Sequence, residues 1–190
     1  MQILPKNVGI LAFLGPYVHH KIILDKLGIF SSYVKNNKDL DSVDALIIPG
    51  TEISSLQFAL KYLLPEIIER VNDGMPILLT GEASALLSES DKTKISFNFR
   101  GLKIKKYSSK TEKRFDKNIQ LSFSDTREFL SKFIKSPKIL QLPNSFRVLA
   151  VADSNREEIV LIENKNILAC IFYPELSDDV RIHEYFLTKI

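Results

Sequence analysis

Short runs of apolar residues recur along the first half of the chain and alternate with segments of helical periodicity. The apolar runs lie at residues 8–13, 29–34, 44–50 and 76–80. Because polar positions hardly interrupt them, they predict strands buried on both faces, as in a parallel sheet. Helices are predicted around Ile23 and Leu27, which share a face and precede Gly28, and over residues 53–64 and 65–73. This alternation predicts an α/β fold with helices on both faces of the sheet.

The pattern changes in the second half of the chain, beyond the polar segment 88–94. Alternating apolar and polar segments follow at residues 102–107, 118–123, 138–142, 146–152 and 157–163. Short strands at such close spacing predict antiparallel additions to the fold. The apolar run 167–172 predicts one more buried strand, which Pro174 ends because proline has no N–H for the ladder. A last helix is predicted after Ser177, as its N-cap, with an apolar stripe that includes Ile182 and Phe186.

Composition narrows the class of protein. The 190 residues are 45% hydrophobic and 26% charged, which is typical of one globular domain over residues 1–190. A net charge of +3 is too mild to predict a nucleic-acid partner. We find neither a signal-peptide pattern nor an apolar stretch of membrane-spanning length, so we expect a cytoplasmic protein without a membrane partner. One cysteine excludes an intramolecular disulfide and a multi-cysteine zinc site, and we expect no metal and no cofactor.

Three turns that follow predicted strands carry the candidate chemistry. They are Gly50-Thr51-Glu52, Gly81-Glu82 and Tyr173-Pro174-Glu175. In open α/β sheets, sites lie beyond the carboxyl ends of the strands. We therefore expect these turns to converge at one edge of the sheet, within about 15 Å of one another given strand spacings near 4.8 Å. A pocket at that edge is predicted to be narrow and acidic.

The order and residues of these segments resemble the glutaminase subunits of pyridoxal 5'-phosphate synthase (the PdxT/SNO family), which are class I glutamine amidotransferases. The matching segments are VGILAFLGPYVHH, DALIIPGTEIS, FIKSPKIL and CIFYPELSDDVRIHEYFL, which span nearly the whole chain. The family usually has glutamine where Leu14 stands. The resemblance implies a flavodoxin-like three-layer α/β/α sandwich with antiparallel strands added in the second half. It also implies that the partner is a pyridoxal 5'-phosphate synthase subunit.

The resemblance fails at the catalytic positions. The family places its cysteine nucleophile in a Gly-Thr-Cys-Ala-Gly turn, and here residues 79–83 put Gly81 at that position. The family's base is the histidine of His-Pro-Glu, and here that position is Tyr173. A phenol, with a reference pKa of about 10, is a poor general base at neutral pH. Glu175 keeps the third position of the triad, which orients the base in the family.

The loop that binds glutamine in the family also differs. Thr51 stands where the family has its second glycine, and Ile53 separates Glu52 from Ser54. Backbone N–H groups of Gly50 and Thr51 are candidates for part of an anion-binding nest. The sequence therefore predicts a catalytically inactive pseudo-glutaminase with a docking or regulatory role in vitamin B6 synthesis.

Two alternatives stay open. One is a hydrolase with relocated catalytic groups, such as Ser84 with a histidine from elsewhere in the chain. The other is an orphan binding protein unconnected with vitamin B6. We interpret Cys170 as a small buried hydrophobe and the three histidines as structural or surface residues (His19, His20 and His183). The basic stretch from Lys103 to Lys117 is interpreted as a solvated hairpin rather than a docking surface.

Overall fold

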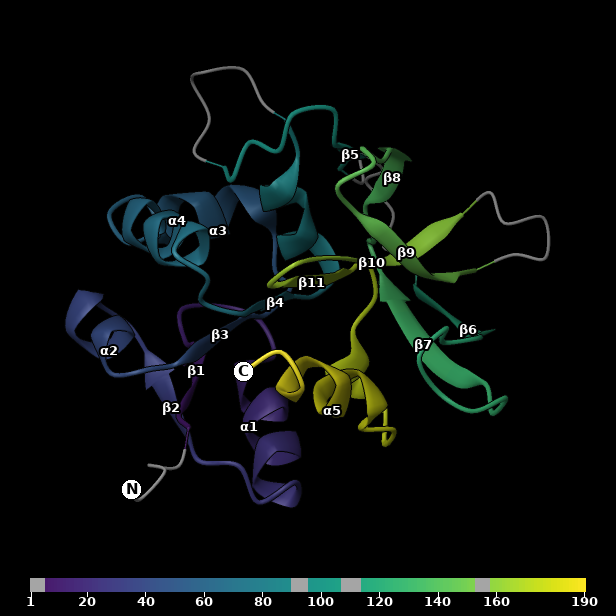
Figure 1. Cartoon of the computed structure of the whole chain (residues 1–190), viewed down its shortest axis with the longest axis horizontal. Coiled ribbons are helices and arrows are strands. Elements are labelled where there is room, and N and C mark those ends of the chain that lie inside the picture. Colours follow the sequence, from purple (N-terminus) through teal and green to yellow (C-terminus); the bar gives the residue numbers. More distant parts are fainter. Residues whose placement is uncertain (1–5, 90–95, 107–113, 153–157) are drawn as a thin grey trace.

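A seven-stranded mixed sheet forms the centre of the protein in a computed structural model that describes residues 6–89, 96–106, 114–152 and 158–190 (Figure 1). Its order is β2-β1-β3-β4-β11-β10-β9. The strands are β1 (Val8–Leu11), β2 (Ser31–Val34), β3 (Ala45–Ile48), β4 (Ile77–Leu79), β9 (Arg147–Val151), β10 (Ile159–Asn164) and β11 (Ile167–Cys170). Neighbouring strands from β2 to β11 pair in parallel, whereas β10 is antiparallel to both β11 and β9. The predicted α/β class is confirmed.

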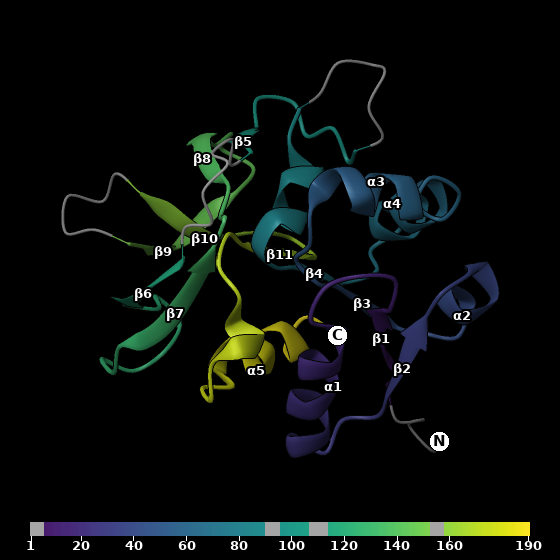
Figure 2. The same ribbon diagram turned by 180° about the vertical axis from the view of Figure 1, so that it is seen from behind.

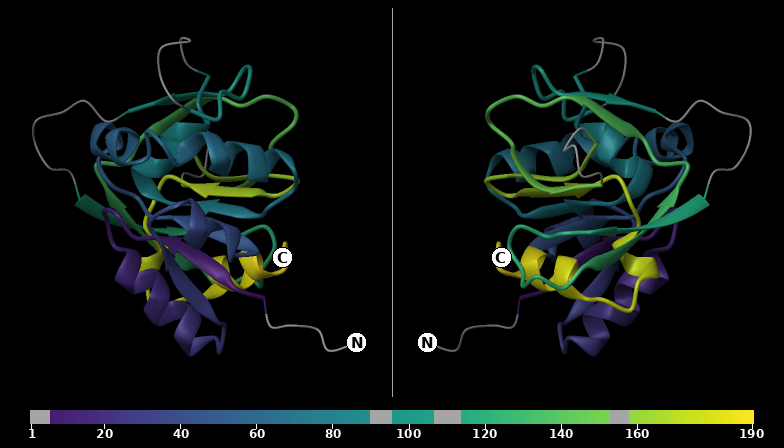
Figure 3. Two further views of the ribbon diagram at one scale, coloured as in Figure 1. Left: turned by 90° about the vertical axis from the view of Figure 1, so that its left-hand side faces the viewer. Right: turned by 90° about the vertical axis from the view of Figure 1, so that its right-hand side faces the viewer.

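Helices cover both faces of this sheet. One layer holds α1 (Tyr17–Lys26) and α5 (Arg181–Leu187), and the other holds α3 (Ile53–Ala59), α4 (Leu64–Asn72) and the 3-10 helix η1 (Gly81–Leu87). The short α2 (Asn37–Asp41) lies beside β2 at the edge of the sheet. Figure 2 shows the same arrangement from behind, and Figure 3 shows the helices above and below the sheet. This is the expected three-layer sandwich.

The apolar patterns explain the layers. Every residue of β1, β3, β4 and β11 is buried, as unbroken apolar runs predict for strands covered on both faces. In α4 the buried residues Leu64, Ile67 and Val71 recur at helical spacing. Gly28 follows α1 with φ +69°, a left-handed conformation that glycine adopts without steric cost, and so the helix ends there.

Two antiparallel ribbons lie beside the sandwich, as the second half of the sequence predicts. β5 (Lys103–Lys105) pairs with β8 (Lys138–Gln141), and β6 (Arg114–Ile119) pairs with β7 (Phe129–Ile134). The alternation predicts a strand at 118–123, but β6 ends at Ile119, and β7 is not predicted. One inward position of β7 is Ser131, whose hydroxyl donates to the Lys117 carbonyl across the ribbon. A polar residue at an inward position hides a strand from a hydrophobic pattern.

The last helix begins later than the sequence predicts. Residues Pro174–Leu176 form a 3-10 helix, η2, and α5 starts only at Arg181, so Ser177 is not its cap. Instead, the Asp179 carboxylate accepts the backbone N–H of Arg181 at 3.1 Å and its Nε at 3.0 Å. Asp179 therefore pairs the first N–H of the helix, whereas the N-cap residue itself, Val180, makes no side-chain cap.

Candidate functional site

Three turns meet at the carboxyl edge of the sheet. Gly50 follows β3, Gly81 follows β4 and Tyr173 follows β11, and these three strands are neighbours in the sheet. The Gly50 N–H donates to Thr80 Oγ1 at 3.0 Å, and the Gly81 N–H donates to the Phe172 carbonyl at 2.9 Å. The turns therefore converge, as parallel strands with adjacent carboxyl ends require.

Gly81 lies in a conformation and a space that suit glycine alone. Its φ is +52°, in the left-handed region, at the sharp turn from β4 into η1. A Cβ built on Gly81 would lie 2.4 Å from Cζ of Tyr173 and 2.7 Å from its Cε2. A Cβ on Gly50 would lie 2.7 Å from Cε1 of the same ring. The tyrosine ring thus fills the space over both glycines.

The phenol of Tyr173 is buried and held in place. Only 7% of the residue is exposed, and its backbone N–H donates to the Lys132 carbonyl of β7 at 2.9 Å. Burial, and then the carboxylates of Glu175 and Glu82, raise the pKa of Tyr173, although the backbone of Glu82 acts in the opposite direction. The phenol is therefore neutral at physiological pH, and a neutral phenol does not serve as a general base.

Glu175 contacts a histidine that the sequence did not pair with it. Its Oε1 lies 3.2 Å from Thr80 Oγ1 and 3.3 Å from Nε2 of His20 on α1. His20 Nδ1 lies 2.9 Å from Nε2 of His183 on α5. His20 shares a helix face with Ile23, which predicts its burial, but nothing in the sequence indicated which buried group it would meet.

The relocated nucleophile has no support in the geometry. Ser84 is 1% exposed, and its hydroxyl donates to the Gly81 carbonyl at 2.7 Å. Cys170 is fully buried, its Sγ lies 3.3 Å from the Phe172 carbonyl, and burial raises the pKa of the thiol well above its usual value. Both side chains thus have the packing role that the sequence favoured.

The loop at residues 50–52 opens onto an apolar groove. Thr51 is half-buried, and the exposed Glu52 accepts a hydrogen bond from Ser54 Oγ at 2.8 Å. A Cβ on Gly15 would lie 2.5 Å from the Gly50 carbonyl, so the segment after β1 abuts this loop. Next to it lies a groove of about 510 Å³, lined by Phe13, Leu14, Ser54, Ser55 and Phe58.

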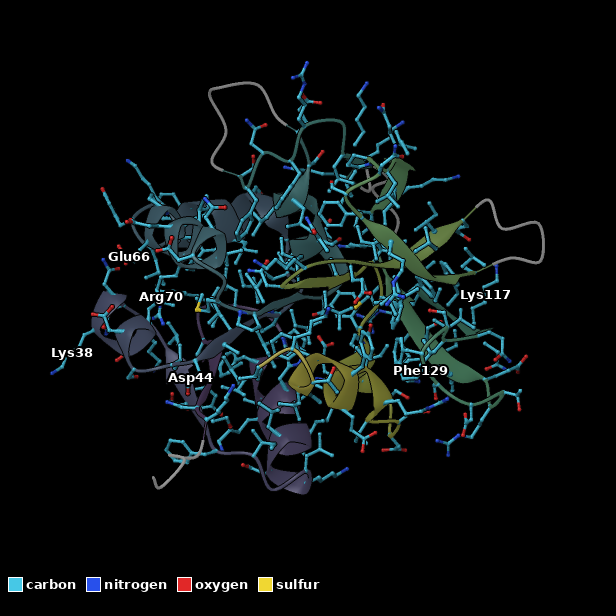
Figure 4. All side chains as sticks on the ribbon, viewed as in Figure 1. Lys38, Asp44, Glu66, Arg70, Lys117 and Phe129 are labelled. Atoms are coloured by element: carbon cyan, nitrogen blue, oxygen red, sulfur yellow. The ribbon has the colours of Figure 1, made fainter. Side chains whose placement is uncertain are left out.

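Other candidates lie away from the three turns. Lys117 on β6 approaches Glu158 at 3.8 Å (Figure 4), and Lys103 and Lys105 are exposed on β5. Lys110 and Lys113 lie outside the described residues. Within the described ranges, no cluster of three or more His, Cys, Asp or Glu side chains is placed to hold a metal ion. Among the same residues, no helix combines the length and apolar character needed to cross a membrane.

Comparison with known proteins gives consistent matches along the chain. The model of the SNO glutamine amidotransferase family matches residues 10–190. The pyridoxal 5'-phosphate synthase subunit PdxT of Thermotoga petrophila is 32% identical over 190 residues, which cover 97% of this chain and 99% of that protein. The subunit of the same name from Dictyoglomus turgidum is 28% identical, over 96% of this chain and 98% of its own.

Solved structures agree with this match. A crystal structure of a glutamine amidotransferase superposes with a TM-score of 0.85 at 25% identity, over 96% of this chain and 97% of that chain. The structure of PurLQS from Thermotoga maritima superposes with a TM-score of 0.72 at 13% identity, over 97% of this chain and 99% of that chain. The second likeness is one of fold alone.

Proposed function

Because the chain belongs to the SNO glutamine amidotransferase family, we propose that it is a pseudo-glutaminase of vitamin B6 synthesis. Residues 1–190 would form one glutamine amidotransferase-like domain that binds a pyridoxal 5'-phosphate synthase subunit but does not hydrolyse glutamine. The observation that carries the proposal is the position of the Tyr173 ring, 2.4 Å from where a side chain at Gly81 would begin.

In this geometry, glutamine hydrolysis lacks both the nucleophile that attacks the amide and the base that would activate it. Gly81 has no side chain to attack the amide carbon, and the neutral phenol of Tyr173 stands where the family has its base. In an elbow of this kind, the backbone N–H after the nucleophile stabilises the oxyanion. Here the ring of Tyr173 lies over Gly81, directly before that N–H, at the place where a side chain at position 81 would begin. The tyrosine ring thus lies where a nucleophilic side chain at position 81 would have to stand.

The first expected result is the absence of glutaminase activity. Purified protein, alone or with a synthase subunit, should release glutamate at least about 10⁴-fold more slowly than a family member with an intact Gly-Thr-Cys-Ala-Gly turn, because triad residues act as a unit. A coupled glutamate assay measures this, with heat-killed protein as the blank. Glutamate release that tracks this polypeptide through purification would overturn the proposal.

The proposed docking surface is the groove beside the site. Leu14 is 39% exposed there and Phe58 is 85% exposed, which is unusual for an aromatic side chain in a solvated surface. Tyr62, in the segment after α3, is 83% exposed. The relatives are named as subunits of a synthase, so we assign this apolar surface to contact with a synthase subunit.

The second expected result tests that contact. Phe58→Ser should weaken binding to a synthase subunit by at least about tenfold, because a buried aromatic anchor often contributes more than 1 kcal/mol. Isothermal titration calorimetry measures the affinity. Phe30→Ser is the matched control, since Phe30 is 62% exposed. It precedes β2 and so lies at the amino ends of the parallel strands, whereas the groove lies beyond their carboxyl ends. Equal affinities of wild type and Phe58→Ser would reject this surface, and no binding by wild type would reject the docking role.

A further inference from the structure

The carboxylate of Glu175 joins three elements of the fold through buried contacts. Thr80, at the end of β4, donates its hydroxyl to Glu175 Oε1 and accepts the Gly50 N–H. On the other side, His20 of α1 presents Nε2 to the same carboxylate oxygen, and its Nδ1 meets Nε2 of His183 on α5. A continuous chain of polar groups therefore runs from the β3 turn to the last helix.

All four side chains that make these polar contacts are shielded from water. The side chains of His20 and Glu175 are 0% exposed, and the residues Thr80 and His183 are 0% exposed as well. Burial of a carboxylate is costly unless its oxygens have partners. Among the described residues, Glu175 Oε2 and His183 Nδ1 have no hydrogen-bond partner, and His20 Nε2 has only its 3.3 Å approach to Oε1. The cost of burying the Glu175 carboxylate is therefore offset mainly by the contacts of Oε1 with Thr80 and His20.

We infer that Glu175 serves in this protein as a buried anchor for α1 and α5, in one polar unit with His20 and His183, and that this unit weakens in acid. His20 is a positioning residue in it, because it acts through Glu175. The position that orients a base in the family thus has a second task, one that does not need the base. This inference is independent of docking and of the missing activity.

The two imidazoles make the unit sensitive to protons. One ring must donate and the other accept across the 2.9 Å contact, so two added protons would place like charges side by side. The titratable groups around the unit are Cys170 and Tyr173 near Glu175, with Glu82 next to Tyr173. Burial, and then the charge of His20, hold the pKa of His183 well below its ordinary value.

The lowered pKa of His183 determines whether the protein gains or loses stability as the pH falls. Because the folded-state pKa of His183 is below the unfolded value of about 6.5, the unfolded chain binds more protons than the folded one. The contribution to stability is therefore complete above about pH 6.5 and is lost as the pH falls below it.

Thermal unfolding of the full chain at pH 7.5 tests the anchor. Glu175→Ala and His20→Ala should each lower the midpoint by about 10 °C, because each leaves a buried partner unpaired in a protein of this size. The double variant should lose much less than the sum of the two. His19→Ala, exposed on the same helix, is the matched control and should shift by at most about 2 °C. Additive losses, or a control that shifts as much as His20→Ala, would overturn the anchor.

A measurement on the wild type remains decisive if these variants do not fold. The chain has three histidines, so their imidazole ¹⁵N signals can be followed individually with pH. In folded protein at pH 5.5, one ring should keep the signals of a neutral imidazole, and its loss on further acidification should coincide with unfolding. Three charged rings in folded protein at pH 5.5 would contradict the inference.

Discussion

Gly81→Cys is expected to lower the free energy of unfolding by about 2–4 kcal/mol, measured by urea denaturation. Two costs combine at this position. A non-glycine residue at φ +52° is strained by roughly 1 kcal/mol, and a new Cβ at 2.4 Å from Tyr173 Cζ forces the ring or the turn to move, at about 1–3 kcal/mol. Deletion of the ring should recover the second cost, so Gly81→Cys should cost less in a Tyr173→Ala background.

Gly28→Cys separates the two costs. Gly28 has φ +69°, close to that of Gly81, but a Cβ there would meet nothing within 4 Å. It should therefore show the strain alone, roughly 1 kcal/mol. If Gly81→Cys cost no more than Gly28→Cys, the ring would not fill the space over Gly81.

The double substitution Gly81→Cys with Tyr173→His should leave glutaminase activity at least about 10³-fold below that of an intact family member. It restores the types of nucleophile and base but not their surroundings. Thr51 and Glu82 still replace the small residues of the family's oxyanion region, where one lost donor costs roughly 10²–10³ in kcat. Glu175 Oε1 is also engaged by Thr80 and lies 3.3 Å from His20 Nε2, so only Oε2 is left to orient a new imidazole.

Single-turnover glutamate release with a synthase subunit present measures this directly. Circular dichroism and the urea midpoint of the same double variant are the control, because an unfolded protein would be inactive for a trivial reason. Activity within tenfold of the intact member would show that the rest of the site has kept its catalytic geometry. That outcome would contradict our view that the loops have changed together with the triad.

The parallel core was predictable because the burial of its strands leaves a direct mark on the sequence. Residues 44–50 and 76–80 are nearly continuous apolar runs, and the structure buries every residue of β3 and β4. The ribbons were less predictable. β7 alternates buried and exposed residues but places Ser131 inward, where a hydrogen bond to the Lys117 carbonyl replaces an apolar contact. The sequence alone does not reveal such a hydrogen bond, because its donor and acceptor lie on different strands.

The meeting of the three turns could be predicted from the sequence, but the contacts among their residues could not. The sequence indicated that Gly81, Tyr173 and Glu175 would share one edge of the sheet. Two features depended on tertiary geometry, namely the collision that a side chain at 81 would meet and the pairing of Glu175 with His20. Both join residues that are far apart in the sequence, and no local pattern encodes such a distance.

The contact between Gly81 and Tyr173 also constrains the order of evolutionary change. A side chain at position 81 and this tyrosine cannot occupy the same space, so the ring blocks a return to cysteine for as long as it is in place. From an ancestor with cysteine and histidine, a path through glycine first meets no such clash, whereas tyrosine first would meet the existing side chain. By the same geometry, a return has to replace the tyrosine before position 81 regains a side chain. The packing of one ring thus fixes the order in which these two positions can change, in either direction.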